Sequence, residues 1–165
     1  MQFSKMILLL CIFAFAYKAQ AQKILLQIPG ITSEEGEPVT AVEFVLENSI
    51  DLGSITGGGG AGKVRQKTFK FKKEAGVSTS SFFDSIVKGT AYDTVLFKYY
   101  DAADVLFYII KFEKVLIGEM SWLSPECPSC IQLEHLVSIG FGKISTEDKI
   151  NNIKKSWNFI SNTTN

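Results

Sequence analysis

Several stretches of this chain alternate apolar and polar side chains with a period of two residues, and this alternation limits the folds that the chain can adopt. The clearest stretches are residues 42–47, 69–72 and 135–142; in the second, Phe69 and Phe71 alternate with Lys70 and Lys72. Successive side chains of a strand point to opposite faces of a sheet, so the pattern predicts half-buried strands. Further strands are expected at residues 23–28, 94–100 and 105–117, the last two joined by a hairpin turn. The sequence therefore predicts a mainly β protein.

One segment has the pattern of an α-helix. Residues 78–81 read Ser-Thr-Ser-Ser and offer N-cap oxygens, and Gly89 is a suitable C-terminal residue. Between them lies an apolar stripe at helical spacing, which we expect to pack in the core: Phe82, Phe83, Ile86 and Val87. The C-terminal part, residues 145–165, is polar, and its few apolar residues fit either a helical stripe or a strand at residues 157–160.

The first 21 residues have the features of a secretory signal peptide. Lys5 precedes a twelve-residue apolar run at 6–17, which is too short to span a bilayer, and Ala19-Gln20-Ala21 matches a cleavage site. We therefore expect a mature domain at residues 22–165, with the protein secreted or periplasmic. An uncleaved anchor is the alternative.

The length of the mature chain fits one domain with a single core. Loss of Lys5 and Lys18 would leave 15 basic against 17 acidic residues, and the basic residues are not clustered. This balance gives no reason to expect a nucleic-acid partner, and no other apolar stretch reaches membrane length.

A glycine-rich run resembles a phosphate-binding loop at first sight. Gly57, Gly62 and Lys63 fit the Walker A spacing, but Val64 stands where a hydroxyl is required. A phosphate-binding loop also opens a helix, whereas here the two-residue alternation of a strand follows. We interpret the run as a flexible loop that leads into a strand.

The expected mature chain keeps two cysteines, Cys127 and Cys130, in a predicted loop. In an oxidising compartment they could form a small disulfide, and free thiols or redox activity are the alternatives. With His135 they supply three of the four ligands that structural zinc needs, with Glu126 or Glu134 as a poor fourth. We predict no metal site, no cofactor and no catalytic residues. A single histidine and scattered acids do not form a recognisable catalytic group.

Six motifs follow one another along the chain: an opening strand and turn, a glycine loop leaving through Gly-Lys-Val, the strand after it, the helix, a Phe-Gly-Lys-Ile strand and a Ser-Trp-Asn-Phe element. In this order they are residues 26–31, 57–64, 69–73, 80–89, 141–144 and 156–159. With these motifs in this order, the chain resembles the Hcp family, the haemolysin-coregulated proteins of the type VI secretion system.

The resemblance implies a small β-barrel of two antiparallel sheets with one α-helix alongside, and hexameric rings that can stack into a tube. It also implies a contact role for the glycine loop between rings. The candidate contact residues are Gly57, Gly58, Gly59, Gly60, Gly62 and Lys63. The partners expected are other copies of the chain and secretion-spike or effector proteins. The export signal departs from the family, whose tubes assemble in the cytoplasm.

Three functions follow from these observations. The first is a non-enzymatic, exported, ring-forming protein that carries effectors. The second is a secreted monomeric binding module on the same barrel. The third is an enzyme that uses the glycine loop or the cysteine pair.

Overall fold

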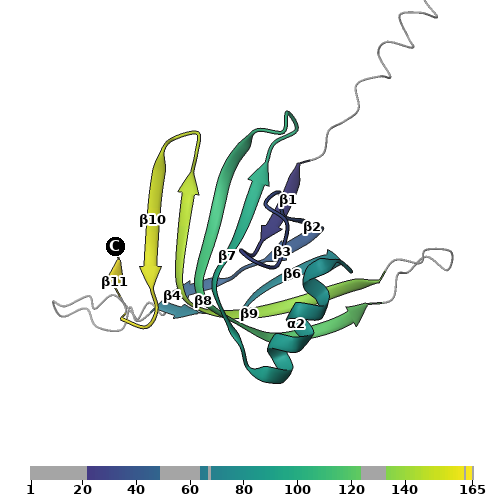
Figure 1. Cartoon of the computed structure of the whole chain (residues 1–165). Helices are drawn as coiled ribbons and strands as arrows, with labels where there is room; N and C mark the ends of the chain where they lie inside the picture. Colours follow the sequence, from purple (N-terminus) through teal and green to yellow (C-terminus); the bar gives the residue numbers. More distant parts are fainter. Residues whose placement is uncertain (1–21, 49–63, 67, 124–132, 162, 165) are drawn as a thin grey trace, which may run out of the picture.

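The computed structural model describes residues 22–48, 64–66, 68–123, 133–161 and 163–164. Within them eleven strands and one α-helix follow one another along the chain (Figure 1). The first six strands are β1 (Lys23–Gln27), β2 (Glu37–Val39), β3 (Ala41–Glu43), β4 (Leu46–Asn48), β5 (Val64–Gln66) and β6 (Phe69–Glu74). They are followed by α2 (Val77–Lys88), β7 (Ala91–Tyr100), β8 (Leu106–Leu123), β9 (Glu134–Asp148), β10 (Ile153–Asn158) and β11 (Thr163–Thr164).

The main sheet curves into a nearly closed barrel. Hydrogen-bonded neighbours run from β6 through β9, β8 and β7 to β1 and β2, and β3 returns to β6. Thr40, between β2 and β3, donates its backbone N–H to the Lys72 carbonyl oxygen at 2.8 Å. The segment containing β2 and β3 therefore joins the two ends of the sheet, and the predicted mainly β barrel with one helix is confirmed.

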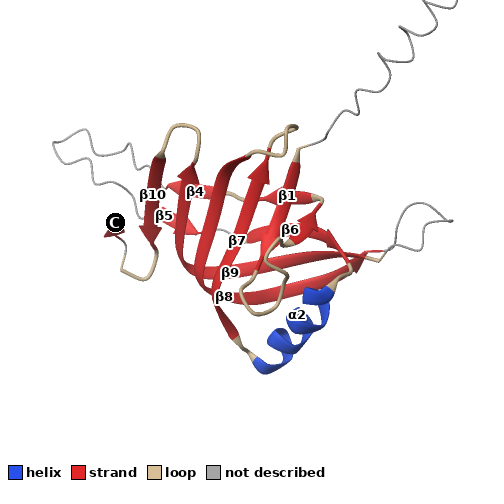
Figure 2. Ribbon diagram, turned by 45° about the horizontal axis from the view of Figure 1, so that its top comes forward, coloured by secondary structure: helices blue, strands red, loops and turns tan. Residues whose placement is uncertain are grey.

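Two long strands, β8 and β9, run through both halves of the barrel and turn sharply at the middle (Figures 1 and 2). Lys114 of β8 has a left-handed backbone with φ of 56°, and the pairing of β8 with both neighbours skips this residue. Gly142 of β9 stands opposite, where an added Cβ would lie 2.8 Å from Ile160 Cδ1 and 3.3 Å from the Cβ of Lys114. Glycine thus leaves room at the bend for the Ile160 side chain and for the facing strand.

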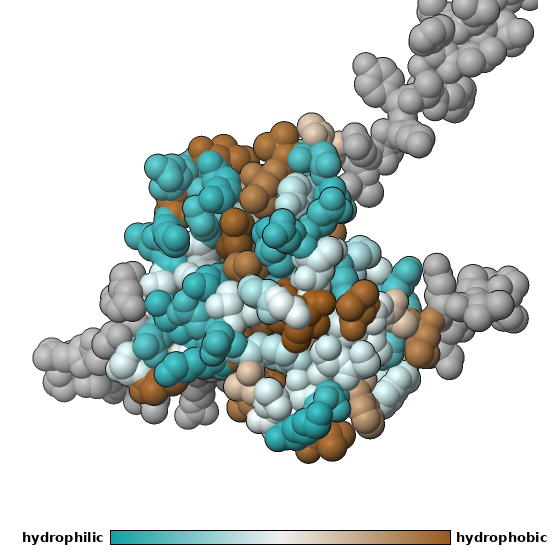
Figure 3. Space-filling model, viewed as in Figure 1, coloured by the Kyte–Doolittle hydropathy of each residue, from teal (hydrophilic) through white to brown (hydrophobic). Residues whose placement is uncertain are grey.

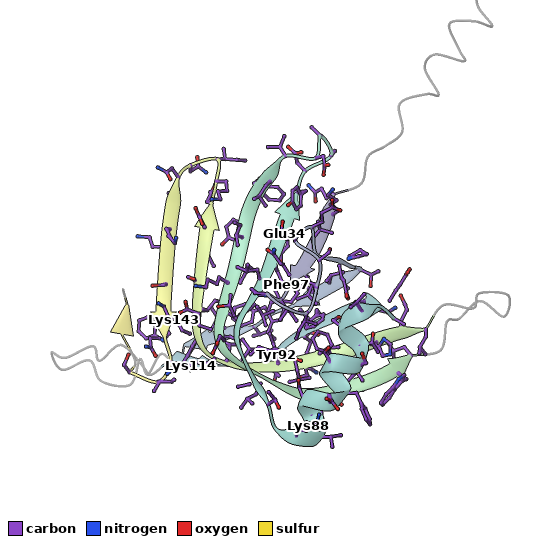
Figure 4. The ribbon with its side chains drawn as sticks, in the orientation of Figure 1. Glu34, Lys88, Tyr92, Phe97, Lys114 and Lys143 are labelled. Carbon is purple, nitrogen blue, oxygen red and sulfur yellow. The ribbon has the colours of Figure 1, made fainter. Side chains whose placement is uncertain are left out.

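The core between the two halves is a cluster of phenylalanines. Phe69, Phe97 and Phe112 are fully buried, and the Phe69 ring centroid lies 4.7 Å from that of Phe97 and 4.6 Å from that of Phe112. Figure 4 shows Phe97 among the side chains where the sheet and α2 meet. Tilted and edge-on ring pairs at such distances stabilise a core beyond the area that they bury.

The helix differs in two respects from the sequence prediction. It begins at Val77 with Gly76 as its N-cap, earlier than the Ser-Thr-Ser-Ser segment. Only Phe82 of the predicted core stripe is buried, while Phe83, Ile86 and Val87 face outward. The inward face uses Ser78 and Ser85 instead, because their hydroxyls find partners there: Ser78 Oγ donates to Glu37 at 2.7 Å, and Ser85 Oγ donates to the Ser81 carbonyl oxygen at 2.8 Å. The C-terminal Gly89 has the expected left-handed backbone, with φ of 68°.

Three boundaries in the β structure also differ from expectation. The alternation at residues 42–47 was expected within one strand, but the chain forms β3 and β4 there, which pair with β6 and β5 respectively. The strand expected at residues 105–117 ends later, because β8 continues to Leu123 beside β9. The open choice at the C-terminus is settled in favour of a strand, β10, paired with β9. The hairpin between β7 and β8 is as predicted, with Asp101 accepting the backbone N–H of Val105 at 2.9 Å.

We expect Gly36→Ala to destabilise the protein. Gly36 lies in the turn between β1 and β2 with φ of 96°, and an added Cβ would come within 2.8 Å of the Leu26 carbonyl oxygen. The positive φ alone costs an alanine about 1–2 kcal/mol. Urea unfolding should show a loss of at least that size.

Gly140→Ala is the matched control. The position has open space around an added Cβ, so the substitution should leave stability unchanged or raise it by about 0.4–1 kcal/mol through the unfolded chain. Equal losses for the two variants would contradict the role assigned to Gly36.

Candidate functional site

The outward face of α2 is an apolar surface that the barrel core does not use. Val77 is 71% exposed, Phe83 53% and Val87 67%, and all three lie on this one helix. Figure 3 shows apolar side chains exposed on this side of the molecule between hydrophilic ones. Isolated exposed apolar residues are ordinary, but several on one short helix indicate a surface that another molecule covers.

A shallow groove of 640 Å³ runs beside this helix. One wall is the first two turns of α2, including Thr79 and Phe83, and the other is the end of β8, with Met120 and Trp122. The Trp122 side chain is 54% exposed. The groove therefore joins the apolar helix face to an aromatic side chain on the sheet, and we call the two together the α2 face.

Among the described residues, the same part of β8 has a strand partner on one side only. Strand β7 pairs with β8 only as far as Leu116, whereas β9 accompanies β8 to Leu123. On the other side, helix α2 packs against β8. A helix in this position protects the edge of a sheet from pairing with another strand.

The predicted contact loop is carried by a separate two-stranded arm. Strands β4 and β5 pair only with each other, from Leu46 opposite Gln66 to Asn48 opposite Val64. The chain after Lys63 enters β5, which agrees with the interpretation of a loop leading into a strand. The glycines themselves, Gly57 to Gly60 and Gly62, and Lys63 lie outside the described residues, as do Cys127 and Cys130.

Behind the α2 face, a buried ion pair ties the helix to the barrel. Lys73 of β6 is 1% exposed, and its Nζ lies 2.7 Å from Oε2 of Glu37 on β2. The other carboxylate oxygen, Oε1, accepts the backbone N–H of Ser78 at 2.8 Å. Burial alone would raise the pKa of Glu37, but the hydrogen bonds from Lys73 and Ser78 outweigh it and hold the pKa below its ordinary value.

Gly76 makes room for this arrangement. A Cβ added there would lie 3.0 Å from Glu37 Oε2 and 3.3 Å from Lys73 Nζ. The N-cap of α2 has no side chain of its own, so the carboxylate of Glu37 takes over the capping of the helix N-terminus from another strand.

His135, the single histidine of the chain, lies next to this ion pair. It stands opposite Lys73 on β6 and Trp122 on β8 and is 1% exposed. Neither ring nitrogen has a hydrogen-bond partner among the described residues. Burial lowers the pKa of His135, and the positive charge of Lys73 lowers it further. The ring is therefore neutral at ordinary pH.

The rest of the described chain shows neither a metal site nor a membrane helix. No group of three or more His, Cys, Asp and Glu side chains that could hold a metal ion occurs in it. His135 sits beside a buried lysine, which disfavours a cation. Over the same residues, no helix is both long and apolar enough to cross a bilayer.

Comparison with known families gives a direct result. The family model described as "Type VI secretion system effector, Hcp" matches residues 32–147, which is well over half of the chain. The chain belongs to the Hcp family. The match begins before β2 and ends in β9, so it includes the whole of α2 and most of the barrel of this Hcp protein. No curated protein matches the chain in sequence.

Solved Hcp structures share the fold. A structure described as a type six secretion system protein superimposes with a TM-score of 0.75 at 14% identity, over 88% of this chain and all of that one. Hcp1 from Salmonella typhimurium gives 0.72 at 17% identity, over 88% and 99% of the two chains. A mutant Hcp1 from E. coli EAEC 042 gives 0.68 at 21% identity, over 86% and 99%. At these identities the likeness establishes the fold.

Family membership places the protein among the tube and effector proteins of type VI secretion, a family of structural secretion proteins that is not known for enzymatic activity. The geometry agrees with this assignment, because the features that stand out in the described residues are surfaces and a structural ion pair. Sequence reasoning missed the α2 face, since it assigned the apolar stripe to the core. The helical spacing of Ser78, Ser81 and Ser85 was the signal that could have identified the inward face of α2.

We expect stability to fall in weak acid because of His135. The folded protein holds the imidazole neutral, whereas the unfolded chain takes up a proton near pH 6.5. The free energy of unfolding is therefore unaffected by His135 above about pH 6.5. It decreases as the pH falls from there toward the lower pKa of the folded state. Urea unfolding at pH 8 to 5 measures the slope.

His135→Phe should flatten this slope between pH 7 and 5, because no other histidine titrates in that range. The remaining loss of stability at lower pH then belongs to the carboxylates, Glu37 among them. An unchanged slope in the variant would contradict the placement of a neutral imidazole beside Lys73.

Proposed function

We propose that this Hcp protein is exported through its own signal peptide and assembles outside the cytoplasm into hexameric rings that can stack and carry effectors. The observation that carries the proposal is the α2 face, an apolar helix surface beside a groove. A monomer leaves this apolar surface in water, whereas a neighbouring subunit would bury it.

The family supports a ring, since it consists of tube and effector proteins of type VI secretion. The β4–β5 arm supports contact beyond one ring, because it stands apart from the main sheet in its strand pairing and leads into the glycine loop. Glycines would let the backbone of a neighbour approach closely. Each of these surfaces lies away from the phenylalanine core, so assembly would leave the barrel itself unchanged.

Light scattering of residues 22–165 at several concentrations tests the ring. We expect a mass near six subunits for the wild-type protein and a monomer for Phe83→Asp, because a buried unpaired carboxylate is costly at an interface. Phe83 is half exposed in the subunit, so the variant should still fold, and circular dichroism with a thermal melt checks this.

Ile150→Asp is the matched control. Ile150 is 75% exposed at the turn between β9 and β10, away from α2, and the same charge there should leave the mass unchanged. A wild-type protein that remains monomeric at every concentration would overturn the ring and favour the monomeric binding module. Equal effects of both substitutions would overturn the role of the α2 face.

Export should change two covalent features of the chain, its N-terminal residue and the state of its cysteines. The full-length protein, expressed in a Gram-negative host, should be recovered from the periplasm or medium beginning at Gln22. Cys127 and Cys130 should then form a disulfide, and the intact mass should be lower by two hydrogen atoms than that of the reduced chain. Mass spectrometry measures both at once.

A chain that begins with an initiating Met directly before Gln22 serves as the control. It should stay in the cytoplasm with both thiols free. Recovery of the full-length protein from the cytoplasm with residues 1–21 still attached would refute export by this segment.

A further inference from the structure

An apolar pocket lies on a different side of the molecule from the α2 face. It is formed where β4 meets β8, β9 and β10, and its volume is 370 Å³. None of its lining residues takes part in the groove beside α2. Pockets that bind small molecules usually measure about 300–1,000 Å³ and have mostly apolar walls.

The walls of this pocket are mainly aromatic and aliphatic. The apolar lining residues come from all four strands and from the segment before β4: Phe44, Leu46, Tyr108, Ile110, Ile144 and Trp157. Ser145, Thr146 and Ser156 are the uncharged polar residues of the lining. Leu46 is 52% exposed and stands at the rim. The barrel core does not fill this space, so an apolar body of suitable size can enter it.

One charged group in the pocket has no partner. Lys155 is exposed, and among the described lining residues it is the only charged side chain. Unlike Lys154, which lies 3.9 Å from Glu147, Lys155 takes part in no ion pair within the described part of the chain.

We propose that this pocket binds an amphiphilic carboxylate, a molecule like a fatty acid. Its hydrocarbon chain lies among Phe44, Tyr108 and Ile110, and its carboxylate meets the ammonium group of Lys155 at the rim. An apolar cavity with one free cation is complementary to a molecule that carries a single negative charge at the end of an apolar body.

Tryptophan fluorescence gives a direct test with dodecanoate as the probe. The chain has two tryptophans, and Trp122 lies on the α2 face, so Trp122→Phe leaves Trp157 as the only reporter. Titration of this variant should give a saturable change in emission below the micellar concentration of the probe. Dodecan-1-ol, which has the same chain and no charge, should also bind, but more weakly.

Substitutions at two neighbouring lysines distinguish the effect of the Lys155 charge on binding from that of the apolar walls. Lys155→Ala should weaken dodecanoate binding about two- to fivefold, the size expected for an exposed ion pair, and should leave dodecan-1-ol unaffected. Lys154→Ala removes the same charge from the preceding residue of β10 and should leave the affinity for both probes unchanged. Leu46→Glu, which places a negative charge at the rim, should abolish binding of dodecanoate.

Three outcomes would overturn the proposal. The first is no saturable change in Trp157 emission. The second is equal loss of dodecanoate affinity for Lys154→Ala and Lys155→Ala. The third is an emission change that depends on protein concentration without any probe, because it would mean that a second copy of the chain covers the pocket.

Discussion

The close packing of phenylalanine rings inside the barrel is the interaction on which the rest of the structure depends. Phe69 comes from β6, Phe97 from β7 and Phe112 from β8, so the three rings join strands on opposite sides of the barrel. Phe141 of β9 extends the cluster, with its centroid 4.4 Å from that of Phe112. Because the rings fill the space inside the barrel, the apolar side chains of α2, and of the strands that line the apolar pocket, remain available for contacts outside the core.

The ion pair of Glu37 and Lys73 places the helix on this barrel. A buried ion pair adds little net stability compared with apolar residues, but loss of one partner leaves an unpaired charge and is costly. The main effect of the pair is therefore to position the helix. The Glu37 carboxylate binds the N-terminus of α2 at Ser78 and fixes which side of the helix faces inward. The exposure of Phe83 and Val87 is a consequence of this fixed orientation.

The sequence was sufficient to predict the fold, because strand alternation and the order of motifs are local signals. It was less successful with α2, where Phe82 and Phe83 are equivalent by spacing and only the distant Glu37 decides which one is buried. The alternation at residues 42–47 has the pattern of a single strand, yet β3 there pairs with β6 and β4 pairs with β5. The apolar pocket also could not be predicted, since its residues come from four strands that are far apart in the chain.

The closure of the barrel has a consequence for the order of events during folding. Strand β6 pairs on one side with β9, where Phe69 stands opposite Ile139, so the barrel cannot close until nearly the whole chain is present. Pairings between distant residues form slowly, and the early strands keep open edges until they do. A chain of this kind stays open for longer than one built from local contacts.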